Sequence, residues 1–91
     1  MPINVSNSEA LGRTLAAARM MAGMDQASLA EAANVSAGTV SNVERGRDAE
    51  PETVKAVRNA LSRQGVLIGF SRNNGLATVS ISFATDDEEE D

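Results

Sequence analysis

The segment from Gln26 to Gly46, QASLAEAANVSAGTVSNVERG, constrains the fold of this chain more than any other part of it. Its small and apolar residues recur at helical spacing on both sides of a break at residues 34–36, which predicts a helix, a tight turn and a second helix. Two helices this short are not stable alone, so they must pack on neighbouring elements and leave the polar edge of the second helix outside. The positions expected to be buried are Ala27, Leu29, Ala30, Ala33, Val40 and Val43.

Two longer helices are expected on either side of this pair. Ser6 and Glu9 have the spacing of a capping box, in which each side chain accepts a hydrogen bond from the backbone of the other, and a helix over residues 8–22 follows. Pro51 suits the first turn of a fourth helix, because its missing N–H costs nothing there. The N-caps expected for the two short helices are Asp25 and Ser36.

Beyond Gly65 the apolar period changes to two, which predicts a β-hairpin around the turn signal at residues 73–75. One face of this hairpin is apolar and the other carries hydroxyl groups. An isolated hairpin is only marginally stable, so its apolar face must dock either on the fourth helix of its own chain or on a second copy. Long strands with free edges invite pairing, and we expect the second copy. The residues expected at this dimer interface are Ile68, Phe70, Val79, Ile81 and Phe83.

Composition excludes several classes of function. The chain has no cysteine and no histidine, so disulfides, thiolate or imidazole metal sites and the common nucleophile–base pairs are absent from it. We therefore expect no enzymatic activity, no catalytic residues, no metal and no cofactor. No segment approaches the roughly 20 apolar residues of a membrane span, and the N-terminal residues are neither basic nor apolar enough for export. A cytoplasmic protein is expected.

Several short motifs within residues 11–61 occur in one order along the chain: Arg19, Asp25-Gln26, Leu29-Ala30, Val35-Ser36, Glu44-Arg45-Gly46 and Pro51. With these motifs the segment resembles the Cro/C1-type (phage-repressor-like, XRE) helix-turn-helix family. The resemblance implies a mainly α fold class, with a four-helix lambda-repressor-like domain over residues 1–64, and the hairpin over residues 65–85 is expected to follow it as a dimerisation element. The resemblance further implies a largely buried ion pair between Arg19 and Glu44 that orients the third helix.

The resemblance also implies a DNA-binding surface around the third helix. In this family the positions after the turn and those one turn later face the bases, while a glutamine at the start of the second helix contacts phosphate. Small residues at Ala37 and Gly38 have a second interpretation, in which they only permit a tight turn between helices. The residues expected to bind DNA are Gln26, Ser36, Ala37, Gly38, Thr39, Ser41, Asn42, Arg45 and Arg47.

The formal net charge of −5 argues against a nucleic-acid partner only as an average. Residues 86–91 read DDEEED, and without these six carboxylates the chain has eight basic and seven acidic residues, a net charge of +1. We expect the run to be a disordered acidic tail. Two alternatives are a competitor that folds over the DNA-binding face and a handle for a basic partner.

The expected function is a repressor-like transcriptional regulator that binds an inverted-repeat operator in double-stranded DNA as a homodimer. The alternative belongs to another class. A nearly neutral body with few strong base-reading side chains also suits a protein-interaction module on the same fold, such as an antitoxin or an antiactivator that binds another protein. Neither function requires a membrane.

Overall fold

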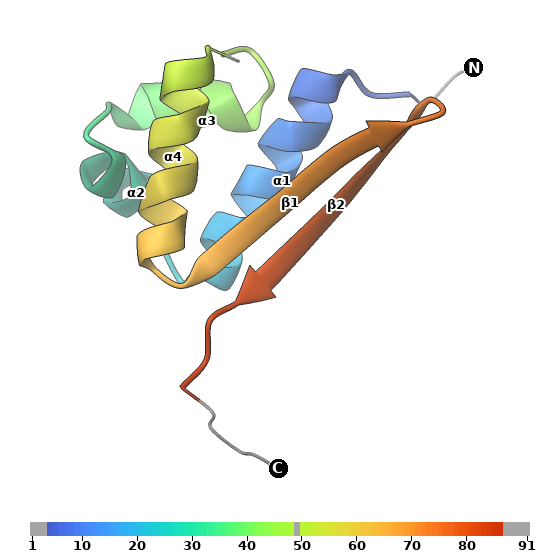
Figure 1. Cartoon of the computed structure of the whole chain (residues 1–91). Helices are drawn as coiled ribbons and strands as arrows, with labels where there is room; N and C mark the ends of the chain where they lie inside the picture. The colour runs from blue at the N-terminus through green and yellow to red at the C-terminus, as the bar shows by residue number, and fades with distance from the viewer. Residues whose placement is uncertain (1–3, 49, 87–91) are drawn as a thin grey trace.

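The structure is a computed structural model that describes residues 4–48 and 50–86. Four helices come first and a two-stranded antiparallel hairpin follows them, which confirms the expected fold class (Figure 1). The elements are α1 (Asn7–Met21), α2 (Gln26–Ala33), α3 (Ala37–Glu44), α4 (Pro51–Arg63), β1 (Val66–Asn73) and β2 (Leu76–Phe83).

The helix starts follow the local capping rules. Ser6 Oγ accepts a hydrogen bond from the Glu9 backbone N–H at 3.0 Å, and Glu9 Oε1 accepts one from the Ser6 N–H at 2.9 Å, which completes the expected capping box. Asp25 accepts from the Ser28 N–H at 2.8 Å, and so caps α2. Because these bonds are local, the sequence predicted the starts of α1 and α2 to within one residue.

Gly46 permits the close passage of the chain after α3. Its φ is +76°, and a Cβ built there would lie 2.8 Å from the Cα of Glu9. Any side chain at this position is therefore strained in its backbone and also collides with the first turn of α1. The glycine fixes how the end of α3 lies against α1.

The core lies where the four helices meet. It consists of alanine, valine and leucine side chains. Ala27 was expected in this core, but it is exposed. Successive residues of an α-helix are rotated by about 100° around its axis, and this rotation places Ala27 outside the sector of α2 that Leu29, Ala30 and Ala33 share. The buried apolar residues are Leu15, Ala18, Leu29, Ala30, Ala33, Val40, Val43, Val57, Ala60, Leu61 and Val66.

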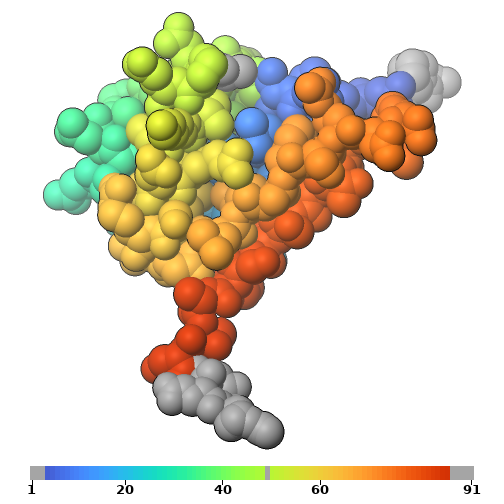
Figure 2. Space-filling model, viewed as in Figure 1, coloured from blue at the N-terminus to red at the C-terminus, as the bar shows by residue number. Residues whose placement is uncertain are grey.

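The hairpin lies against α1 and α4 of its own chain, with β2 on the outer side (Figures 1 and 2). Val66 is buried, and Ile68 and Ile81 pack against the core as half-buried side chains. Of the other apolar residues on this face, Phe70 is half-buried, whereas Val79 is 46% and Phe83 is 52% exposed. The hairpin thus closes the core of its own chain at Val66, Ile68 and Ile81, which is the first of the two docking modes considered above, and it leaves Val79 and Phe83 exposed.

Candidate nucleic-acid interface

The outer side of α3 carries the residues that the sequence predicted to face DNA. Val40, Val43 and Glu44 turn inward and are buried. Thr39 and Ser41 are half-buried beside them. The other predicted residues of α3 and of the segment just beyond it are exposed: Ala37, Gly38, Asn42, Arg45 and Arg47.

The start of α3 is held by two hydroxyl groups. Ser36 Oγ accepts a hydrogen bond from the Thr39 backbone N–H at 3.0 Å, and the Ser36 and Thr39 hydroxyls lie 2.9 Å apart in a second bond. Ser36 is exposed and serves as the N-cap, so these bonds set the direction in which the first amides of α3 point. Amides at a helix N-terminus favour a negatively charged neighbour such as phosphate.

Gly38 has no packing reason to be a glycine. A Cβ built at this position would meet one heavy atom within 4 Å, the Ser36 Oγ at 3.8 Å, which is an ordinary contact. The neighbouring Ala37 is exposed as well. The interpretation that these residues are small to permit a tight turn therefore has no support in the contacts around Gly38. Small side chains here keep the first turn of α3 accessible from outside.

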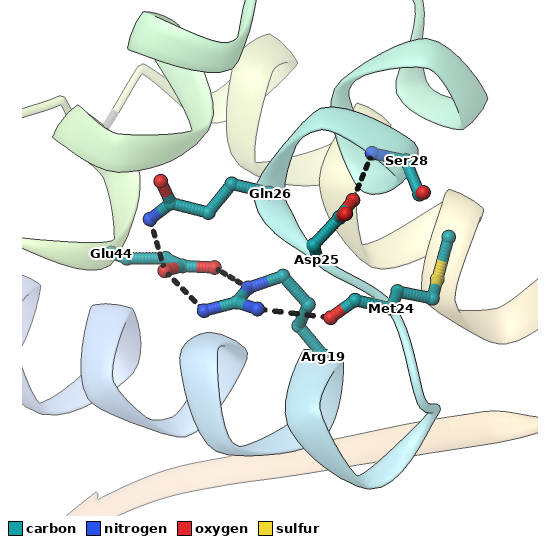
Figure 3. Close-up of polar contacts among 6 residues, drawn as sticks. All are labelled: Arg19, Met24, Asp25, Gln26, Ser28 and Glu44. Atoms are coloured by element: carbon teal, nitrogen blue, oxygen red, sulfur yellow. Dashed lines mark hydrogen bonds and ion pairs between the residues drawn. The ribbon is translucent and has the colours of Figure 1, made fainter.

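Arg19 and Glu44 form the expected ion pair between α1 and α3 (Figure 3). Arg19 Nε donates to Glu44 Oε2 at 2.6 Å, and Nη2 donates to Glu44 Oε1 at 3.2 Å, so the contact is bidentate. The Nη1 group donates to the Met24 carbonyl oxygen at 2.9 Å. The side chains are only 14% and 7% exposed, and the pair thus fixes the end of α3 and the loop before α2 relative to α1.

Gln26 adds a contact that the sequence did not predict. Its Nε2 donates to Glu44 Oε1 at 2.9 Å, and the half-buried side chain lies beside the ion pair (Figure 3). A primary amide has two N–H donors, and this bond uses one of them. The contact depends on the distance between two helices, which no local pattern in the sequence reports.

Charge on this surface is mixed. Arg45 and Arg47 are exposed, and the Arg47 N–H donates to the Asn42 carbonyl oxygen at 2.8 Å as the chain turns back after α3. The half-buried Asp48 and the exposed Glu50 follow closely. The carboxyl of Asp25, at the start of α2, has its pKa held below the ordinary value chiefly by the hydrogen bond from the Ser28 backbone.

The described residues contain neither a metal-binding cluster nor a membrane-spanning helix. Within 4–48 and 50–86, no group of three or more histidine, cysteine, aspartate or glutamate residues is placed to hold a metal ion. The described helices include none that is both long and apolar enough to cross a membrane.

Comparison with known proteins gives a family and a structural relative. The family model described as a helix-turn-helix domain matches residues 10–68. Among solved structures, the chain is similar to the clp gene regulator ClgR from Corynebacterium glutamicum, with 39% identity and a TM-score of 0.59. The match covers 67% of this chain and 65% of that chain, so it spans slightly less than two thirds of the regulator. The curated proteins gave no match.

Proposed function

Because the chain belongs to the helix-turn-helix domain family, as its motifs predicted, we propose that it is a sequence-specific DNA-binding regulator of transcription. The similarity to a gene regulator supports this function. The observation that carries the proposal is the outer side of α3, where accessible small residues are followed one turn later by hydrogen-bonding side chains. A helix enters the major groove most closely at its N-terminal half, and it needs this order of side chains to do so.

Base recognition is assigned to three side chains of α3. Asn42 is exposed and carries an amide, which can make two hydrogen bonds to adenine. Ser41, which is half-buried, makes a less selective contact, and the exposed Ala37 methyl group suits a thymine methyl. Gly38 lets the helix backbone approach the groove.

Phosphate contacts are assigned to residues around the ends of the two short helices. Gln26 lies in the first turn of α2, and its bond to Glu44 holds its amide in one orientation. Arg45 and Arg47 supply the positive charge. Ser36 and Thr39 order the start of α3, so their effect on DNA binding comes through the backbone amides that they position.

We further propose that the regulator binds as a homodimer. Two copies of α3 related by a two-fold axis would read an inverted repeat whose half-site centres lie about 10 base pairs, or a multiple of that, apart. The uncovered part of the hairpin's apolar face, at Val79 and Phe83, supports a dimerisation role for residues 65–85. Residues 1–64 would then form the DNA-binding domain. The proposed acidic tail lies outside the described residues from position 87 onward.

A second candidate function is binding to another protein through the same fold, as an antitoxin or antiactivator does. It is favoured by the acidic residues Asp48, Glu50 and Glu52, which closely follow the two arginines at the end of α3. A phosphate backbone repels carboxylates in this place, whereas a basic protein partner would attract them.

The test is a selection of bound duplexes from a random DNA library with the full chain. The proposal predicts enrichment of an inverted repeat, because two symmetric copies read two half-sites. The selected DNA should then compete with excess random DNA in a gel shift. Enrichment of no sequence over several rounds would contradict specific DNA binding and would favour the protein-binding alternative.

A further inference from the structure

We propose that β2 is the strand through which two copies of the chain pair, edge to edge and antiparallel, about a two-fold axis at Ser80. This pairing rests on the proposed dimeric function and specifies its interface. The result would be one four-stranded sheet shared by the two subunits, with the strand order β1-β2 in one copy continuing as β2-β1 in the other.

The two edges of the hairpin differ in what covers them. On the β1 side, α4 packs against the strand, and Arg58 Nη2 donates a hydrogen bond to the carbonyl oxygen of Ile68 at 2.8 Å. This bond occupies an outward-facing backbone group that a new strand would need. β2 packs on α1, but only Ile81 among its residues is half-buried and the others are exposed. Its free edge lies along the outer rim of the molecule, away from α4 (Figures 1 and 2). Of the two edges, β2 is the one left open to a partner strand.

The hydrogen-bond pattern identifies the backbone groups at the free edge. The Ala84 N–H donates to the Gly65 carbonyl oxygen at 2.7 Å, and the register pairs Val66 with Phe83. Hydrogen-bonded and non-hydrogen-bonded pairs alternate in an antiparallel ladder, so the even-numbered residues of β2 bond to β1. The residues that direct both N–H and C=O to the free edge are Ala77, Val79, Ile81 and Phe83.

The sequence of β2, LATVSISF, lacks the features that usually protect an edge strand. It contains no charged residue and no proline, and it is rich in β-branched side chains. In two-fold pairing the two strands have the same sequence, so a charged side chain in one strand would lie near the same charge in the other and be repelled by it. An uncharged strand avoids this repulsion. Pairing would also cover part of the exposed surface of Val79 and Phe83.

The register follows from the faces of the sheet. Directly opposed residues in an antiparallel pair share a face, so a two-fold axis must lie at a residue and not between two residues. With the axis at Ser80, Val79 faces Ile81 of the partner subunit and Ala77 faces Phe83 of the partner subunit. This register uses residues 77–83 of both strands and makes about eight backbone hydrogen bonds.

Each neighbouring register keeps only about six of these backbone hydrogen bonds, because its outermost hydrogen-bonding pair includes a residue outside the strand. An axis at Val79 would set Phe83 opposite Gly75 in the turn, and an axis at Ile81 would set Ala77 opposite Thr85, beyond the end of β2. On the face of the sheet that carries the hydroxyl groups, Gly69 of β1 lies opposite Ser80 of β2. A Cβ built at Gly69 would lie 2.5 Å from Ser80 Oγ. The glycine leaves space for the Ser80 side chain at the proposed axis.

Disulfide trapping in the full chain tests both the edge and the register. The protein has no cysteine, so Ser80→Cys introduces a unique thiol with a conservative change. At the axis the two residues would form a non-hydrogen-bonded pair with Cα atoms about 4.5 Å apart, within the range of a disulfide. Mild oxidation should therefore link most of the Ser80→Cys protein into covalent dimers, while its circular dichroism stays unchanged.

Thr78→Cys and Ser82→Cys are matched controls on the same strand and face. Each thiol would lie about 14 Å from its own copy, so neither variant should cross-link alone, whereas an equal mixture of the two should form the mixed disulfide. Cross-linking of Thr78→Cys or Ser82→Cys in preference to Ser80→Cys would overturn the register. A Ser80→Cys protein that sediments as a dimer without cross-linking would overturn the β2 edge and leave the dimeric regulator standing. A monomer that still selects specific DNA would overturn the pairing but not DNA recognition.

Discussion

The Gln26 side-chain amide donates a hydrogen bond to Glu44 Oε1 over 2.9 Å, and so joins the first residue of α2 to the last residue of α3. The same carboxylate is the partner of Arg19 in α1. One glutamate therefore receives contacts from two other helices, and the orientation of α3 depends on it. The interior of the molecule and the proposed DNA-binding surface are linked through this residue.

Glu44→Gln should destabilise the protein strongly. The change leaves the guanidinium of Arg19 without its charged partner in a site that is 14% exposed. Loss of one partner in a buried pair typically costs about 3 to 5 kcal/mol, and the partial exposure of Arg19 places the expected loss near the lower end. Urea unfolding measures it.

The double variant Arg19→Met/Glu44→Leu is the control for this experiment. It leaves no unpaired charge, so it should recover much of the stability that Glu44→Gln loses. A loss below about 1 kcal/mol in Glu44→Gln would show that the pair behaves like a surface salt bridge and does not hold α3.

Gly38→Ala should separate stability from DNA binding. The space around this position is open and its backbone is helical, so alanine should stabilise α3 by up to roughly 0.5 to 1 kcal/mol. The added methyl group stands where the helix is proposed to approach DNA, so operator affinity should fall. Thermal unfolding and a gel shift measure the two effects. Unchanged affinity in the stabilised variant would remove Gly38 from the interface.

Asp25→Asn should make stability less sensitive to acid. The backbone N–H of Ser28 holds the pKa of the Asp25 carboxyl below its ordinary value of 3.8. A lowered pKa in the folded state means that the carboxylate stabilises the fold above about pH 4, and that this contribution is lost as the pH falls through the folded-state pKa. Asparagine retains a capping oxygen without the charge.

The melting temperatures of wild type and Asp25→Asn should thus differ most at neutral pH and converge in strong acid. Glu9, whose pKa is lowered chiefly by its hydrogen bond with the Ser6 backbone, adds a similar acid dependence in both proteins. Parallel curves down to the lowest pH would show that the charge of Asp25 contributes nothing to the cap.

Val79→Asp should weaken dimerisation without unfolding the subunit. Val79 is 46% exposed in the single chain, so a charge there is tolerated before pairing but lies next to the partner strand afterwards. Sedimentation at micromolar concentration should show more monomer. Operator affinity should fall, because a monomer contacts one half-site and no longer links it to the second. Leu67→Asp is the matched control and should remain dimeric. Leu67 is similarly exposed, but it lies in β1 and on the other face of the hairpin from Val79.

Removal of the whole hairpin is a poorer test of the same point. Val66 is part of the buried core, and Ile68 and Ile81 pack against it. Truncation after Gln64 would therefore expose apolar surface of the helices and confound loss of the partner with loss of stability.

What the sequence predicted correctly depends mostly on short-range rules. The capping box at Ser6 and Glu9 and the hairpin turn, with positive φ at Asn74 and Gly75, follow from neighbouring residues, and the structure has them where they were expected. The ion pair of Arg19 was predicted from the family resemblance. The Gln26–Glu44 and Arg58–Ile68 bonds were missed, because each joins elements whose distance is set by tertiary packing.

The hairpin shows how far a periodic pattern can be interpreted. Alternation predicted one apolar face, but it does not say what covers that face. In the structure Val66 is buried in the core of its own subunit and Ile68 and Ile81 pack against that core, whereas Val79 and Phe83 remain about half exposed. α4 packs on β1, whereas β2 packs on α1 and contributes Ile81 to the core.

The most direct test of the central claim, that α3 reads DNA bases, is the affinity of Asn42→Ala for the selected operator and for random DNA at one salt concentration. Asn42 is exposed and buries no part of the core, so the variant should fold normally. The operator affinity should fall by about 1 to 3 kcal/mol, which is roughly 5- to 150-fold, with little change on random DNA. Equal losses on both DNAs, or no loss on either, would contradict base reading by α3.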